Sequence, residues 1–260
     1  MHNSSKLGRR AKGNIQLDGW YAESFRLSFF DMGNWIQRPL FTELTGAAAA
    51  QIVVQPPMQI HQETGALDDA NLTVSQQSNR MDIVLSDLPT RNTMNPSLPN
   101  YRPFFWIGPY EESLPRFDEI CAKATSAIAG ARRVAYAVTL INQTSSMQES
   151  LARLSVFLPT IAVDSQKDSD LIFQINRPIR DQKHGLINRL ARWETLSMAT
   201  MMLGTVPPIA PVISMTTFGA RVYVDISSDD QKTEQISDVR ELLAELREQA
   251  LTIIDKGDSK

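Results

Sequence analysis

The sequence predicts an α+β protein in which antiparallel sheets are covered on one face by helices. Three observations lead to this prediction. Stretches with apolar residues at helical spacing alternate with short runs in which apolar and polar residues alternate, as helices and half-buried strands require. Some of these runs flank turn-like sequences, which favours antiparallel hairpins. The composition, with 42% hydrophobic and 21% charged residues in 260, is that of a globular chain with a substantial core.

The first half of the chain is expected to be one α+β unit over residues 14–130. It follows a basic tail, residues 1–13, which has no apolar core behind its charges and is expected to add little to the fold. A strand is expected over residues 24–30. A short helix should begin at Pro39 and end at Gly46, because proline suits the first helical position and glycine the position after the last.

A hairpin and the first long helix complete this half. Residues 71–74 and 80–85 alternate apolar and polar side chains on either side of the turn-like sequence SQQSN. Between the hairpin and the helix, residues 88–115 include six prolines, which predicts a long irregular connection. The helix should begin near Ser113 and end before Gly130. Its apolar stripe is formed by Phe117, Ile120, Cys121, Ala124 and Ile128.

The second half, residues 131–257, is expected to start with a strand and a short capped helix. The strand covers residues 134–141. The helix begins at Ser146, where Glu149 three residues later completes a capping box, and Pro159 ends it.

Three further strands and a long helix follow, with the strands over residues 171–177, 186–193 and 220–226. Asp238 and Glu241 form a second capping box. The long helix after it carries an apolar stripe of Val239, Leu242, Leu243, Leu246, Ala250, Ile253 and Ile254. Both halves therefore run strand, short helix, two or more antiparallel strands and long helix. This order predicts two similar β-α-β-β-(β)-α units, either separate or built on one continuous core.

Several of these segments resemble a known family. The segments RVAYAVTLIN, FQINRP and VYVDI, together with the length and the element order, are similar to a sporadically distributed family of uncharacterised bacterial proteins of about 260 residues. The resemblance covers most of residues 20–255. It implies a bacterial protein with a duplicated α+β plan, and it carries over no catalytic residue.

Charge and cysteine content limit the classes of function. The formal net charge of -3 and the pI of about 5.7 argue against a protein that coats nucleic acid along its whole surface, but they allow one local basic patch. A single cysteine excludes an internal disulfide framework and a cysteine-rich zinc site, and it fits a reducing cytoplasm.

One segment, Thr195 to Ala220, contains no charged residue. A spanning helix needs about 20 predominantly apolar residues. This segment is interrupted by Gly204, Pro207, Pro208 and Pro211. The sequence therefore predicts a buried segment followed by a proline-rich loop, and no membrane association.

Recognisable catalytic patterns are absent from the sequence. It has no P-loop and no glycine-rich dinucleotide turn, so no cofactor is expected. His61 and His184 are isolated, and Cys121 lies on an apolar helix stripe. Asp164 and Asp225 lie in acidic runs at strand–loop junctions, where aspartate is an ordinary turn residue. No metal site is expected, but a metal-assisted hydrolase stays as an alternative if these two carboxylates are neighbours.

The strongest functional lead is the segment 173–193, FQINRPIRDQKHGLINRLARW, which has five Lys or Arg residues against one Asp. Aligning its two Ile-Asn-Arg tripeptides in a hairpin puts Asn176 opposite Asn188, and Ile175 opposite Arg189. One face of the hairpin then faces the core with arginines at its rim, and the other is polar. The candidate ligand- or phosphate-binding residues are Asn176, Arg177, Arg180, Asn188, Arg189 and Arg192.

Two interpretations of this hairpin are open. It is either a solvated sheet face whose arginines pair with carboxylates, or a binding strip in which guanidinium groups hold phosphate or carboxylate and asparagines supply specificity. The leading hypothesis for the whole chain is a non-catalytic binding or interaction protein of the bacterial cytoplasm, an accessory component that works with another protein. The alternatives are nucleic-acid or nucleotide binding through residues 173–193, and the metal-assisted hydrolase. The sequence does not indicate the oligomeric state.

Overall fold

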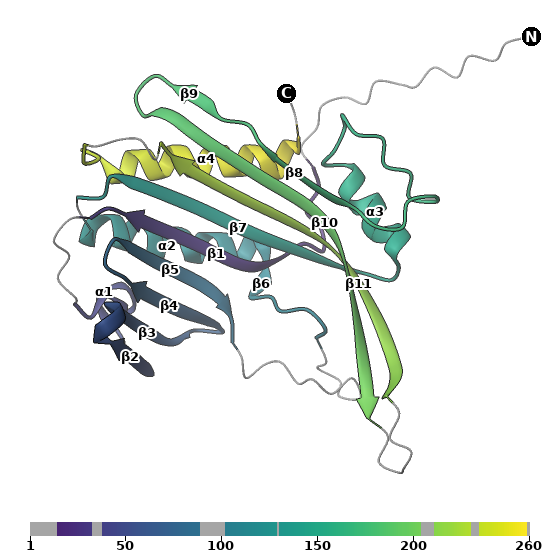
Figure 1. Cartoon of the computed structure of the whole chain (residues 1–260), viewed down its shortest axis with the longest axis horizontal. Helices are drawn as coiled ribbons and strands as arrows, with labels where there is room; N and C mark the ends of the chain where they lie inside the picture. Colours follow the sequence, from purple (N-terminus) through teal and green to yellow (C-terminus); the bar gives the residue numbers. More distant parts are fainter. Residues whose placement is uncertain are drawn as a thin grey trace, which may run out of the picture.

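The computed structural model describes residues 15–32, 38–88, 102–128, 130–203, 211–229 and 234–258. In this part of the chain, eleven strands form one sheet and four helices pack against it (Figure 1). The strands are β1 (Tyr21–Phe30), β2 (Gln51–Gln55), β3 (Ile60–Leu67), β4 (Ala70–Gln76), β5 (Arg80–Asp87), β6 (Gly108–Pro109), β7 (Arg133–Thr144), β8 (Ile172–Asn176), β9 (Ile179–Asp181), β10 (Gly185–Leu203) and β11 (Pro211–Ser228). The helices are α1 (Leu40–Thr45), α2 (Tyr110–Ala127), α3 (Met147–Ser155) and α4 (Val239–Lys256), and Pro56–Met58 forms a 3-10 turn. The predicted tail, residues 1–13, lies outside the described residues.

The sheet is continuous across the two predicted halves. Its strand order is β2-β3-β4-β5-β1-β7-β11-β10-β8, with β6 beside β1 and β9 beside β10. Every pairing in the described residues is antiparallel, which confirms the predicted α+β class and the antiparallel sheet. The sheet therefore connects residues of both predicted halves, since β1 pairs with β5 on one side and with β7 on the other. The internal repeat stays a prediction.

One face of the sheet carries the core. Alternate residues of the central strands face the helices, and their side chains are fully buried. Phe25 of β1, for example, stacks on Phe117 of α2 with ring centroids 5.1 Å apart, and Phe117 also contacts Tyr136 of β7 at 5.8 Å. The helical stripes predicted from the sequence are thus the surfaces that close the core.

The opposite face carries a polar network on its central strands. Asp225 of β11 accepts hydrogen bonds from Arg26 and from the Tyr223 hydroxyl, each at 2.7 Å. Burial and the neighbouring Asp225 carboxylate raise the pKa of Tyr223 to about 12, so the phenol stays a donor at neutral pH. Glu194 of β10 is only 5% exposed and accepts hydrogen bonds from Arg192 and Arg221, at 2.9 and 2.5 Å. Arg26, Arg192 and Arg221 are therefore already paired with carboxylates.

Glu23 gives the first testable prediction. It lies where β1 bulges against β7, 3.6 Å from Arg221. Burial raises the pKa of its carboxyl above the ordinary 4.5, and nearby Glu194 adds to this, although Arg221 acts in the opposite sense. A raised pKa means that the charged form is less favourable in the folded than in the unfolded chain.

We therefore expect Glu23→Gln to raise the free energy of unfolding at neutral pH. The gain should fade as the pH falls through the raised pKa of the folded protein, and it should be lost well below 4.5, where wild-type Glu23 is protonated in both states. Urea unfolding of both proteins at several pH values measures this difference. A variant that is less stable than wild type at neutral pH would show that the ion pair with Arg221 outweighs the cost of burial.

The uncharged run Thr195 to Ala220 does not form the buried segment that the sequence predicts. The described part belongs to β10 and β11, which pair with each other as a long hairpin. The side chains of Ser197, Ala199 and Thr216 are exposed. An apolar composition usually indicates burial, but here it belongs to strands that extend past their neighbours in the sheet. Of the predicted proline-rich loop, Gly204, Pro207 and Pro208 lie outside the described residues, whereas Pro211 is the first residue of β11. None of the helices in the described ranges has both the length and the apolar composition of a membrane span.

Candidate functional site

The basic hairpin forms as β8, β9 and β10, and a tight turn fixes its register. Asp181 Oδ1 accepts hydrogen bonds from the backbone N–H groups of Lys183 and His184, at 2.9 and 2.6 Å. These bonds lower the pKa of Asp181 below its ordinary value. Gly185 follows with a φ of +80°, which suits a glycine at the end of a three-residue hairpin loop. The turn therefore pairs Asp181 with Gly185 and sets all later pairs.

The predicted register of this hairpin is wrong by two residues. Asn176 pairs with Leu190 instead of Asn188, and Ile175 pairs with Ala191 instead of Arg189. The reason is that the local turn, and not the repeated Ile-Asn-Arg tripeptide, decides where the strands meet. A shift of two residues leaves each side chain on its predicted face, since the side-chain period of a strand is two.

The structure brings together only two of the six candidate residues. Arg177 and Arg189 line a pocket between the hairpin and the end of α4. The other four candidates, Asn176, Arg180, Asn188 and Arg192, occupy alternate positions that face away from it. The side-chain oxygen of Asn176 already has a partner within the hairpin, since it accepts a hydrogen bond from the backbone N–H of Arg189 at 3.1 Å. These four therefore share the polar face that the sequence predicts for Asn176, Asn188 and Arg192, and a binding role for either set stays a prediction.

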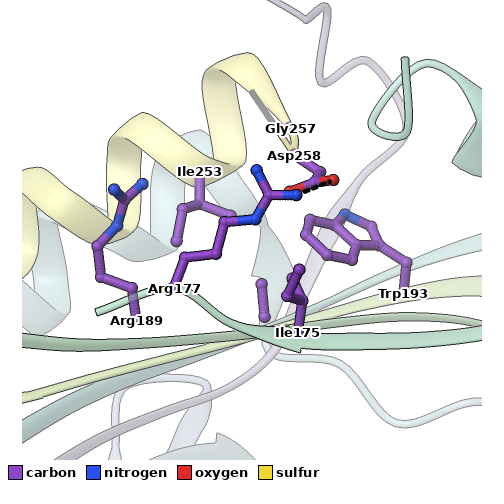
Figure 2. Close-up of a pocket in the computed structure, with 8 residues that line it drawn as sticks. Ile175, Arg177, Arg189, Trp193, Ile253, Gly257 and Asp258 are labelled. Carbon is purple, nitrogen blue, oxygen red and sulfur yellow. Dashed lines mark hydrogen bonds and ion pairs between the residues drawn. The ribbon is translucent and has the colours of Figure 1, made fainter. Parts of the chain in front are cut away.

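The pocket lies under the C-terminal end of α4, and Figure 2 shows both arginines rising from the sheet toward this helix. Its lining consists of Ile175, Arg177, Arg189, Ala191, Trp193, Ile253, Gly257 and Asp258. The space open to the centre of a water-sized sphere is about 10 Å³. One water molecule needs about this much room, so the enclosed part of the pocket is small.

Asp258 anchors one side of the pocket. It is 4% exposed, and its carboxylate lies 3.0 Å from a guanidinium nitrogen of Arg177 (Figure 2). The hydroxyl of Thr160 donates a second hydrogen bond to it at 3.0 Å, and its backbone N–H donates to the carbonyl of Phe157 at 2.7 Å. A buried carboxylate needs such partners to stay charged. Asp258 therefore neutralises Arg177 and fixes the position of its guanidinium group.

Arg189 has no such partner. It is half-buried, and no described residue offers it an acidic group or accepts a hydrogen bond from its Nε. Burial lowers its pKa, and the positive charge of Arg177 lowers it further. Trp193, only 1% exposed, likewise has no acceptor for its Nε1–H among the described residues. The pocket thus presents two buried donors, one of them cationic, that are not used by the protein itself.

Sequence reasoning missed the contribution of α4 to this site. Ile253, Gly257 and Asp258 lie far along the chain from the hairpin, and no motif links the two segments. Strand alternation predicts the core-face position of Trp193, but nothing in the sequence marks its Nε1–H as a donor without an acceptor. The only signal in the sequence was the excess of arginine on strands that also carry apolar residues.

The structure also bears on the alternative metal site. Asp225 is bound by Arg26 and Tyr223 on the polar sheet face, whereas Asp164 closes a turn in which its Oδ1 accepts from the backbone N–H of Gln166 at 3.0 Å. No interaction between the described residues links the two carboxylates. Within the described ranges, no group of three or more His, Cys, Asp or Glu side chains is placed to hold a metal ion.

No protein-family model matches the chain, and a search of curated proteins likewise finds no match. The resemblance inferred from its motifs therefore stays a prediction. The function has to be inferred from the chemistry of the pocket.

Proposed function

We propose that the chain is a non-catalytic binding protein that receives a carboxylate group of another protein in the pocket between its basic hairpin and α4. The observation that carries this proposal is Arg189, a half-buried guanidinium group with no acidic partner among the described residues. Burying a cation without a partner costs free energy, and a bound carboxylate would remove this cost. The guanidinium fork fits a carboxylate, and the Nε1–H of Trp193 supplies a further donor.

The charge of the pocket favours a carboxylate over a phosphate. Arg177 and Arg189 contribute two positive charges and Asp258 one negative charge, which leaves a balance suited to one monoanion. A phosphate monoester carries about -1.5 to -2 charges at neutral pH and would meet repulsion from Asp258. The carboxylate of an aspartate or glutamate side chain carries a single negative charge and therefore fits this balance.

The wider role follows from the same chemistry. Docking of an acidic side chain suits an accessory component of a protein assembly in the bacterial cytoplasm. The nucleic-acid alternative would have to use Asn176, Asn188 and Arg192 on the other face. It is less favoured because Arg192 is already bound to Glu194.

The second prediction tests the pocket directly. We expect Arg189→Met to weaken binding of a fluorescein-labelled polyglutamate peptide by roughly tenfold to a hundredfold. A hydrogen bond to a charged group contributes about 1.5–3 kcal/mol, and about 1.4 kcal/mol corresponds to tenfold. The variant should fold at least as stably as wild type, since it removes a half-buried cation whose pKa is lowered in the folded protein. Fluorescence anisotropy at low salt measures the binding, and urea unfolding measures the stability.

Arg180→Met is the matched control. Arg180 is an exposed residue of the same hairpin that points away from the pocket, so its loss changes only a screened surface charge. Equal weakening by both variants would mean that the peptide senses the general charge of the hairpin, and the proposal would be wrong. A labelled oligothymidylate that binds more tightly than the peptide and is released by Arg192→Met would favour nucleic acid instead.

The duplicated plan is part of the same proposal. Residues 14–130 contain β1, α1, β2 to β6 and α2, and residues 131–257 contain β7, α3, β8 to β11 and α4. This common order of strand, short helix, antiparallel strands and long helix supports two related units that share one sheet.

A further inference from the structure

The outer part of the β10–β11 hairpin forms an arm, defined here as residues 196–203 and 211–217. β7 pairs with β11 only as far as Phe218, and β8 pairs with β10 only as far as Glu194. Beyond these points the two arm strands pair with each other and with no other described strand. Figure 1 shows the arm leaving the sheet as a two-stranded ribbon.

The arm has an unusual surface. No charged residue occurs between Thr195 and Ala220, although 21% of the whole chain is charged, so about five would be expected in a run of this length. Ser197, Ala199 and Thr216 are exposed, and Met215 is 36% exposed. Thr217 and Ala220 are buried, but the exposed positions show that burial alone does not explain the absence of charge.

Within the described residues, each strand of the arm has one edge that pairs with no other strand. Natural proteins usually protect such edges with charged side chains, bulges or covering segments, because free N–H and C=O groups attract further strands. The arm has no charged side chain. A two-stranded ribbon is also only marginally stable in water, and three or more strands are needed for independent stability. These properties favour the addition of further strands.

We propose that the arm pairs edge to edge with the same arm of a second copy of this chain, giving a four-stranded antiparallel ribbon across a twofold axis. In a twofold contact each residue near the axis meets its own counterpart, so a charged residue there would face a like charge. An arm without charges avoids this repulsion at every position. A bilayer is a poorer partner, because the open edges of a two-stranded ribbon cannot be satisfied in lipid. This inference is independent of the carboxylate pocket.

The test is sedimentation equilibrium of the full chain over a range of concentrations. We expect a reversible dimer. Ala199→Lys on β10 and Thr216→Lys on β11, made separately, place a lysine on either arm strand. We expect the variant whose lysine lies at the contact to raise the dimer dissociation constant about tenfold or more, since like charges are brought together. Ala122→Lys on the exposed face of α2 is the matched control and should leave the dimer unchanged.

The proposal is overturned if wild type stays monomeric at all concentrations, if neither arm variant weakens the dimer, or if Ala122→Lys weakens it equally. A monomer that floats with phosphatidylcholine vesicles would likewise overturn it and assign the arm to a lipid surface. Circular dichroism of each variant checks that the fold is kept. The polyglutamate assay separates this result from the proposed function, because Ala199 and Thr216 lie outside the pocket.

Discussion

Replacing Trp193 by alanine is expected to lower the free energy of unfolding by about 3–5 kcal/mol, the range for removal of a large buried aromatic side chain. Trp193 is 1% exposed and stacks on Phe173 of the edge strand β8, with ring centroids 5.8 Å apart. Its indole therefore packs between the edge strand β8 and the C-terminal part of α4. Loss of this ring should leave a cavity and release β8, and urea unfolding followed by circular dichroism measures the effect.

Trp193→Phe is the control for this prediction. It keeps an aromatic ring but removes the Nε1–H, for which no described residue is an acceptor. Because no hydrogen bond within the described residues is lost and most of the ring volume is kept, the variant should lose clearly less than Trp193→Ala, with the smaller cavity as its main cost. It should nevertheless bind polyglutamate more weakly than wild type, since one donor of the pocket is gone. A variant as unstable as Trp193→Ala would show that the N–H has an acceptor on which the fold depends.

Gly257→Ala is expected to cost about 2–5 kcal/mol, which combines overpacking with backbone strain. Gly257 has φ +64° and ψ -154°, a region that is essentially restricted to glycine. A Cβ at this position would lie 2.2 Å from the carbonyl oxygen of Phe157. The clash would separate the end of α4 from the segment after α3 and displace Asp258. We therefore expect the stability and the polyglutamate affinity to fall together.

Gly46→Ala is the matched control, because Gly46 ends α1 with a φ of +76° but no atom lies within 4 Å of the added Cβ. It should cost only about 1–2 kcal/mol, the strain of a left-handed residue with a side chain. Thermal unfolding of both variants measures the difference. Equal losses would show that Phe157 moves aside at little cost and that the close contact does not hold the site together.

The parts of the fold that could be predicted are those with local causes. Ser146 caps α3 by accepting a hydrogen bond from the backbone N–H of Glu149, and Asp238 caps α4 in the same way with Glu241. Gly46 adopts the left-handed conformation expected after α1. In each case the residues that determine the structure lie within one helical turn of one another, so the sequence contains the whole signal.

The parts that could not be predicted depend on distant segments. The pairing of β1 with β7 makes one sheet from two predicted units, and the hairpin register depends on the Asp181 turn instead of the repeated tripeptide. The candidate site likewise has a part that local pattern predicts and a part that depends on distant segments. Alternation along the strands placed Arg177 and Arg189 near the core face, whereas Asp258, which decides their charge balance, arrives through tertiary packing of α4.

The central position of β1 has a consequence for how the chain folds. Phe25 pairs with Leu85 on one side and with Val138 on the other, so the middle of the sheet closes only when segments from both halves have met. Loop closure over such sequence separations is slow, and folding rates fall as contacts become less local. Until β7 arrives, β1 has one open edge in an apolar strand, which is where partly folded chains aggregate. We therefore expect the middle of the sheet to form late in folding, after the second half of the chain is available to pair with β1.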